Sequence, residues 1–104
     1  MSEALKYDDG KPPIGLVDRK ALEGLAQVLA YGANKYSKQN WRLGMKYSRL
    51  YNATLRHLFA FIDGEDYDPE SGLPHLDHAM FGLMVLSNYT KSGRTELDDR
   101  YKGL

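Results

Sequence analysis

The densest group of side chains able to do chemistry lies between Arg56 and His78 of this 104-residue sequence. That stretch contains all three histidines of the sequence and a run of acidic residues. The group consists of His57, Glu65, Asp66, Asp68, Glu70, His75, Asp77 and His78. Mixed imidazole and carboxylate ligands suit zinc, manganese or iron, whereas carboxylates with water suit magnesium. The stretch therefore predicts a divalent-metal site.

The spacing of the histidines indicates how they could meet. His75 and His78 are three residues apart, so both imidazoles project from one side at the start of a helix. His57 lies about two helical turns before Gly64, and an antiparallel helix pair would bring it close to them. In the alternative interpretation, the acidic segment only favours the positive end of the following helix, and residues 68–72 form an ordinary turn.

A second candidate site lies in the segment GANKYSKQNWRLG, residues 32–44. Trp41 and Tyr36 could stack on a base, and Asn40 could read a base edge. The cations that could hold phosphates are Lys35, Lys38 and Arg42. In the alternative interpretation Trp41 fills the core and the cations of the segment are solvated. Taken alone, this segment favours the alternative.

The first 17 residues predict an irregular arm, because Gly10, Pro12 and Pro13 forbid a regular helix there. Lys6 and Lys11 flank a DDG turn within this arm. They could reach a phosphate, or they could belong to an ordinary exposed turn.

Beyond the arm, apolar residues recur with helical spacing and no long segment alternates with period two. Asp18 is a suitable N-cap for the first helix. The fold class expected is all-α: one small domain, residues 1–104, of three to four helices with an irregular arm over 1–17. The expected helices cover residues 18–37, 48–63 and 74–91, with a short fourth helix at 95–101.

Composition excludes several classes of protein. Lys+Arg and Asp+Glu both number 14, so there is no basic excess for holding duplex nucleic acid. The absence of cysteine excludes thiolate zinc sites and thiol catalysis. No apolar run is long enough for a bilayer and no signal peptide is visible, so we expect no membrane partner and a cytoplasmic location. The thin apolar stripes favour a homo-oligomer.

Three motifs give the sequence a family resemblance. They are KYDDGK near the start, GANKY followed by NW, and the long string GE-x-x-DPESGL-x-H-x-x-H. From about Lys6 to Leu86 the sequence resembles the phage-encoded dATP/dGTP diphosphohydrolase N-terminal domain family. The resemblance implies a phage origin, action in the host cytoplasm, and removal of pyrophosphate from purine deoxynucleoside triphosphates with a divalent metal.

The resemblance carries over to individual motif positions of this sequence. These are Lys6, Asp8, Lys11, Lys35, Tyr36, Asn40, Trp41, Arg56, His57, Glu65, Asp68, Glu70, His75 and His78. The sequence departs from the family pattern at Asp77, where a small apolar residue is usual between the paired histidines. It also lacks, on any expected helix, the ExxE-type acidic set of other all-α pyrophosphohydrolases.

The first hypothesis is therefore a metal-dependent nucleoside triphosphate pyrophosphohydrolase that uses magnesium or manganese in preference to zinc. The expected catalytic residues are Glu65, Glu70 and His57. The expected metal ligands are Glu65, Asp68, His75, Asp77 and His78. The expected substrate-binding residues are Lys6, Lys11, Lys35, Tyr36, Asn40, Trp41 and Arg56.

The second hypothesis is a non-catalytic binder. A phage protein with cationic and aromatic residues but an incomplete acid set could sequester a cyclic or linear nucleotide signal of bacterial antiviral defence. The histidines would then be hydrogen-bonding or structural groups and no metal would be needed. A third reading, a helical interaction module, leaves the group of histidines and acids without a purpose.

Overall fold

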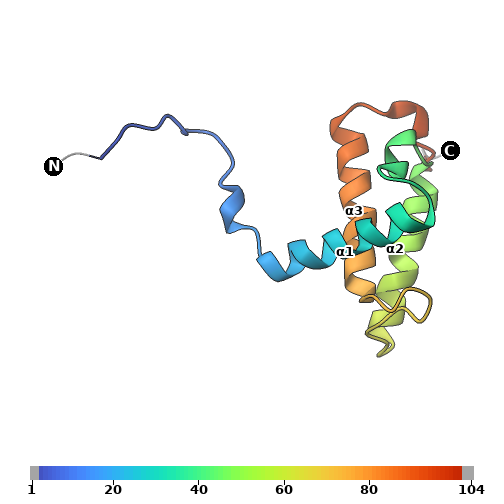
Figure 1. Cartoon of the computed structure of the whole chain (residues 1–104). Helices are drawn as coiled ribbons and strands as arrows, with labels where there is room; N and C mark the ends of the chain where they lie inside the picture. Colours follow the sequence, from blue (N-terminus) through green and yellow to red (C-terminus); the bar gives the residue numbers. More distant parts are fainter. Residues whose placement is uncertain (1–2, 102–104) are drawn as a thin grey trace.

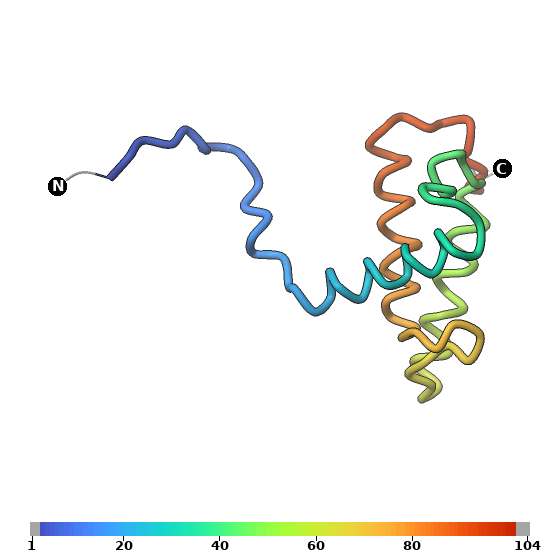
Figure 2. The backbone as a smooth tube through the Cα atoms, viewed as in Figure 1, coloured from blue at the N-terminus to red at the C-terminus, as the bar shows by residue number. Residues whose placement is uncertain are grey.

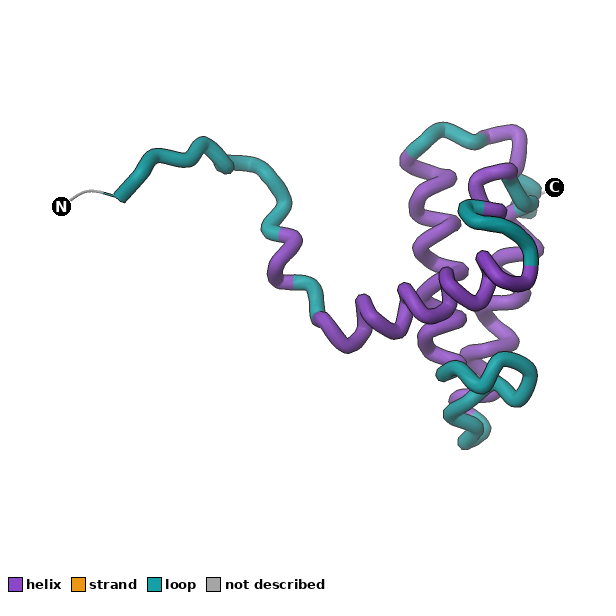
Figure 3. Tube along the Cα trace, in the orientation of Figure 1, coloured by secondary structure: helices purple, strands orange, loops and turns teal. Residues whose placement is uncertain are grey.

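The computed structural model describes residues 3–101 and, within that range, contains helices and no strand. This confirms the all-α prediction. The three main helices are α1 (Arg19–Lys35), α2 (Tyr47–Ile62) and α3 (His75–Lys91). Single 3₁₀ turns occur at η1 (Ile14–Leu16), η2 (Asn40–Leu43) and η3 (Thr95–Leu97). The helices are joined by irregular segments, most visibly the connection from α2 to α3 (Figure 3).

The fourth helix expected over residues 95–101 is only the turn η3, which is a correction to the sequence analysis. The chain leaves helical geometry at Asp98, whose backbone is extended. The Asp98 carboxylate accepts hydrogen bonds from the backbone N–H and the guanidinium of Arg100. These local bonds hold the chain in a bend that competes with a further helical turn.

Helices α2 and α3 form an antiparallel hairpin, and α1 lies across it (Figure 1). The two helices of the hairpin approach closely where Gly82 of α3 meets Thr54 of α2, since a Cβ at Gly82 would collide with the Thr54 hydroxyl. Thr54 is buried, and its hydroxyl donates to the Leu50 carbonyl at 2.8 Å. A residue without a side chain at position 82 therefore sets the distance between the two helices.

The core lies at the end of the hairpin away from the α2–α3 connection. It consists of Trp41, Tyr47, Leu50, Val85 and Tyr89. Tyr89 is fully buried and stacks on Tyr47 with ring centroids 6.2 Å apart. Its hydroxyl donates to the Trp41 carbonyl and accepts from the Met45 N–H, so this buried polar group has partners on both sides. The aromatic core holds η2 against the hairpin.

Helix α1 begins at the predicted cap, because the Asp18 carboxylate accepts from the Ala21 N–H at 2.9 Å. Farther along α1, Gly24 meets the carboxylate of Asp77 on α3, where a Cβ would collide with it. This contact and the close approach at Gly82 both depend on glycine. Together they fix how the three helices cross.

The arm before α1 leads away from the helices (Figure 2). Its described residues are exposed. The radius of gyration is 17.2 Å, against roughly 13 Å for a compact domain of this length. The segment that carries Lys6 and Lys11 therefore lies away from the α1–α2–α3 group.

Candidate functional site

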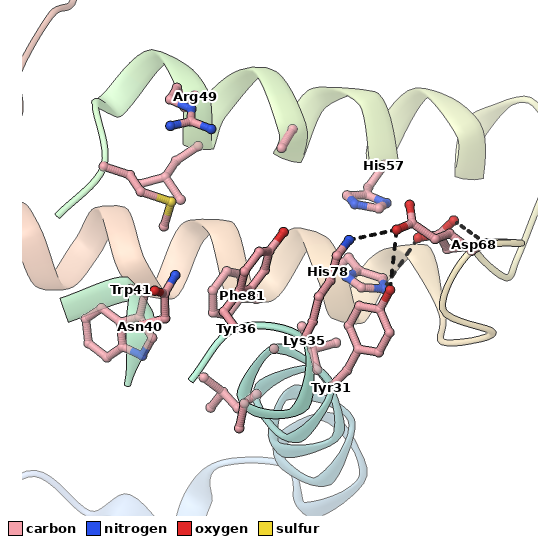
Figure 4. A pocket seen from close by; sticks show the side chains of 18 of the residues that line it. Tyr31, Lys35, Tyr36, Asn40, Trp41, Arg49, His57, Asp68, His78 and Phe81 are labelled. Carbon is pink, nitrogen blue, oxygen red and sulfur yellow. Dashed lines mark hydrogen bonds and ion pairs between the residues drawn. The ribbon is translucent and has the colours of Figure 1, made fainter. Parts of the chain in front are cut away.

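A cavity of about 750 Å³ lies between α1, α2 and the α2–α3 connection. Its walls carry cations and aromatic rings as well as the histidines (Figure 4). The lining includes seven of the residues expected to contact substrate or to take part in catalysis: Lys35, Tyr36, Asn40, Trp41, Arg56, His57 and Glu70. The two segments singled out separately in the sequence thus face one another across one cavity.

Three potential metal ligands gather at one end of this cavity. His57 of α2, His78 of α3 and Asp68 of the connection each offer a ligand atom, and these atoms lie within 4.8 Å of one another. The two imidazole rings are stacked, with centroids 4.6 Å apart and planes 7° from parallel. All three residues are half-buried and line the cavity. We call this set the ligand triad.

The connection between α2 and α3 is built to carry Asp68. The Asp68 N–H donates to the Leu73 carbonyl at 2.9 Å, and the His75 N–H donates to the Asp66 carbonyl at 2.9 Å. The Asp68 carboxylate accepts from the Glu70 N–H at 3.1 Å and lies 3.6 Å from His78 Nε2. Ser71 Oγ also lies 2.7 Å from His78 Nε2. The turn is well formed, as the alternative interpretation held, and it also places a carboxylate beside the histidines.

His75 lies behind the ligand triad, in a hydrogen-bonded chain. Its Nε2 is 2.6 Å from Glu65 Oε1, and its Nδ1 is 2.8 Å from His57 Nδ1. The carboxylate can only accept, so His75 carries its proton on Nε2. A neutral His75 then accepts at Nδ1 from the Nδ1–H of His57. This arrangement leaves the lone pair of His57 on Nε2, which is the state that a metal ligand requires.

Both histidines of the ligand triad have a lowered pKa. Burial is the main cause for His57, assisted by the neighbouring His78 and opposed by Asp68. Burial is also the main cause for His78, where Asp68 again acts in the opposite direction. The two imidazoles are therefore neutral at pH 7, as metal coordination needs.

Glu70 is tied to α1 rather than to the ligand triad. Its carboxylate accepts from Lys35 Nζ at 2.8 Å and from the Tyr31 hydroxyl at 3.5 Å. The hydrogen bond and charge of Lys35 lower the pKa of Glu70, and the same contact raises the pKa of Lys35. The pair closes one side of the cavity between α1 and the connection.

Some expected site residues lie elsewhere. Asp77 packs against Gly24 in the α1–α3 contact, and His75 and Glu65 form the chain behind His57 rather than part of the triad. Trp41 reaches the cavity wall but is buried in the core.

Sequence reasoning missed Arg49, which lines the cavity on the same side of α2 as Ala53 and Arg56. Its spacing of seven residues from Arg56 was the available signal. Sequence reasoning also missed Tyr31, which lies one turn before Lys35 on α1 and lines the cavity. The spacing of four residues from Lys35 was the available signal.

These features define a class: an all-α protein with a polar cavity beside a His–Asp–His set able to hold a metal. The family described as "dATP/dGTP diphosphohydrolase, N-terminal" matches residues 1–100, so the chain belongs to that family. This confirms the resemblance seen in the motifs.

The chain is 41% identical over 96 residues to a protein of Salmonella phage PMBT28 named "dATP/dGTP diphosphohydrolase". The match covers 92% of this chain and 32% of the relative, so the chain spans about a third of the relative's length. No solved structure matches the chain. Among the described residues, no helix is both long and apolar enough to cross a membrane.

Proposed function

We propose that this chain binds purine deoxynucleoside triphosphates in its cavity and hydrolyses them to monophosphate and pyrophosphate with a divalent metal held by the ligand triad. The observation that carries the proposal is the position of His57, Asp68 and His78 at one end of a cavity of about 750 Å³. A volume in this range suits a ligand of nucleotide size. The name of the phage relative and the description of the family support the same reaction.

The donor set fits a first-row divalent ion. Two neutral imidazoles and one carboxylate favour manganese over magnesium, which prefers oxygen ligands alone. The hydrogen bonds from Glu65 through His75 orient His57 toward that role. When bound, the ion supplies positive charge for the triphosphate and activates a water.

The cations on facing walls of the cavity would bind the phosphates. Arg49 and Arg56 stand on α2, and Lys35 stands on α1. Guanidinium groups make paired hydrogen bonds to phosphate oxygens, so the two arginines suit this contact. Tyr36, exposed at the cavity wall, offers a ring on which the purine can stack. Lys6 and Lys11 have no part in this binding mode within one chain, because the arm leads away from the cavity.

The chemical step is attack of a water oxygen on the α-phosphorus. The bond from that phosphorus to the oxygen bridging to the β-phosphorus breaks, and pyrophosphate leaves with the bond electrons. Glu70 is the cavity carboxylate outside the ligand triad and would accept the proton of the water. Its pKa is too low for a good base while Lys35 holds it. A substrate phosphate that draws Lys35 away would raise the basicity of Glu70 at the moment of reaction.

The test is turnover by the purified chain. Incubation with dATP or dGTP and manganese should yield monophosphate and pyrophosphate by ion-exchange chromatography, and His78→Ala should abolish the product. Glu23→Gln, on the outer surface of α1 and paired with Arg19, is the matched control and should keep full activity. No product with any divalent metal, from folded protein, would contradict the proposal.

One observation favours the second candidate function, a nucleotide-binding protein without turnover. The ligand triad contributes a single carboxylate, and the remaining acid in the cavity is neutralised by Lys35. For such a protein, which could sequester a nucleotide signal of bacterial defence, Arg56→Ala would abolish binding and Glu70→Gln would leave it intact. For the hydrolase, Glu70→Gln would remove turnover while binding persists.

A further inference from the structure

Ser71 lies half-buried in the connection between α2 and α3, beside two members of the ligand triad. Its Oγ is 2.7 Å from His78 Nε2 and 3.5 Å from Asp68 Oδ2. The same Asp68 oxygen is 3.6 Å from His78 Nε2. One nitrogen and two oxygens therefore form a closed triangle. The Ser71 hydroxyl at one corner of it has no part in the proposed function.

The size of this triangle matches the spacing of ligand atoms around one metal ion. Ligand atoms about 2.1 Å from an ion are about 3.0 Å apart as neighbours in an octahedron and about 3.4 Å apart in a tetrahedron. The three edges of the triangle, 2.7, 3.5 and 3.6 Å, lie around these values. A circle through the three atoms has a radius of about 1.9 Å, so a point just outside their plane is about 2.1 Å from each. An ion at that point would contact all three atoms.

The hydrogen bonds around Ser71 leave its oxygen able to coordinate. The Leu73 N–H donates to Oγ at 3.1 Å, which fixes the oxygen and uses one of its two lone pairs. A metal ligand must present a lone pair, so a neutral His78 that binds through Nε2 carries its proton on Nδ1. Nε2 and the Asp68 carboxylate are then both acceptors, and the single proton of the hydroxyl can serve only one of them. A divalent ion satisfies both acceptors and takes the second lone pair of Oγ.

We propose that the Ser71 hydroxyl is a fourth ligand of the divalent ion held by the ligand triad. The inference rests on the proposed function, because it concerns the same ion. The donor set is then two imidazole nitrogens, a carboxylate and a neutral hydroxyl oxygen. Serine and threonine hydroxyls bind magnesium in nucleotide sites, whereas zinc sites are built from nitrogen, sulfur and carboxylate ligands. Ser71 therefore shifts the preference of the site from zinc toward manganese.

A purely local role of Ser71 in the turn would produce some of the same effects. The hydrogen bond from the Leu73 N–H holds the connection together, and loss of the hydroxyl would also loosen Asp68. Lower metal affinity after Ser71→Ala therefore has two explanations. A signal that requires direct contact between position 71 and the ion separates them.

The experiment replaces the oxygen at position 71 with sulfur. The sequence contains no cysteine, so the Ser71→Cys chain has a single thiol. Cobalt(II) is the probe ion, because a thiolate bound to it adds an intense charge-transfer absorption in the near ultraviolet. We expect this band from Ser71→Cys with an equimolar amount of cobalt, and its absence from the wild type. Ser92→Cys, exposed at the other end of α3, is the matched control and should lack the band.

Isothermal titration calorimetry with manganese gives a second measurement on the same position. Ser71→Ala should lower manganese affinity by about 10-fold or more, and Ser71→Thr, which keeps the hydroxyl, should retain most of it. Circular dichroism checks that each variant is folded. If Ser71→Cys fails to fold, the comparison of Ser71→Ala with Ser71→Thr still tests the proposal, and equal manganese affinity of Ser71→Ala and the wild type would overturn it.

The outcomes separate this inference from the proposed function. A folded Ser71→Cys chain that binds cobalt without the charge-transfer band would show that position 71 does not contact the ion, while metal binding by the triad and the proposed function would stand. The same band in Ser92→Cys would also overturn the inference, since any exposed thiol would then give it. A wild-type chain that binds neither cobalt nor manganese would overturn both.

Discussion

The two sides of the α2–α3 hairpin come from the same helical turns yet have opposite chemistry. The cavity side carries arginines, two histidines and an acidic connection, and α1 covers part of it. The opposite side carries the exposed apolar side chains Leu55, Phe59, Ile62, Leu76 and Leu83, and the Asp99 carboxylate is hydrogen-bonded to Ser48 near one end of it. A single hairpin can therefore hold a polar site on one side and an apolar surface on the other, because neighbouring positions of a helix point in different directions.

The largest expected effect comes from breaking the contact on which both sides depend. Gly82→Val places a branched side chain against the Thr54 hydroxyl and should push α2 and α3 apart. We expect a loss of about 3 kcal/mol in the free energy of unfolding, measured by urea denaturation. Gly32→Ala is the matched control, since a Cβ there meets nothing within 4 Å, and it should stabilise α1 slightly. Equal stability of the two variants would show that the close approach is unimportant.

On the cavity side, removing a member of the ligand triad should have the next largest effect. His57→Ala leaves one imidazole and one carboxylate, so manganese affinity should fall by about 100-fold or more in isothermal titration calorimetry. The opposite side of the hairpin should be unaffected. Unchanged manganese affinity in this variant would place the metal elsewhere.

A smaller effect on manganese affinity should follow from breaking the hydrogen bonds that link Glu65 through His75 to His57. Glu65→Ala removes the acceptor that holds His75 and, through it, the ring of His57. Manganese affinity should fall by about 10-fold, the usual effect of losing an outer-shell partner. His75→Gln, which can still hydrogen bond at both ends, should recover part of the loss relative to His75→Ala. If both His75 variants bind manganese equally well, His75 contributes packing and no hydrogen bond that orients His57.

The smallest expected effect is a pH dependence of stability in the metal-free protein. The pKa values of His57 and His78 are lowered from 6.5 by burial, so the unfolded chain binds more protons just below that pH. Their contribution to stability is complete above about pH 6.5 and is lost as the pH falls below it. Thermal unfolding in EDTA should show this loss in the wild type, and less of it in a His57→Gln, His78→Gln double variant. Identical pH profiles of the wild type and the double variant would show that His57 and His78 do not cause the loss of stability.

Much of the fold and part of the candidate site could be predicted from the sequence, but not which acidic residue lies beside the histidines. The helices, the Asp18 cap and the meeting of His57 with His78 follow from spacing and capping rules. That Asp68 joins the triad depends on the hydrogen bonds of the connection. The four acidic candidates of the connection, Glu65, Asp66, Asp68 and Glu70, are equivalent in sequence because a turn can direct any of them inward. The apolar stripe of α2 looks the same in the sequence whether the same chain or another molecule covers it.

By itself, the sequence determined the local structure and the family of this protein, since helical periodicity, caps and a long motif are all properties of neighbouring residues. Only the tertiary structure decided which side chains share a site. The absence of a side chain at Gly24 and Gly82 sets where the helices cross. Those crossings bring His57, Asp68 and His78 to one cavity and turn Leu55 and Leu83 away from it. Such distances join residues far apart in the chain, and they depend on packing that no local pattern records.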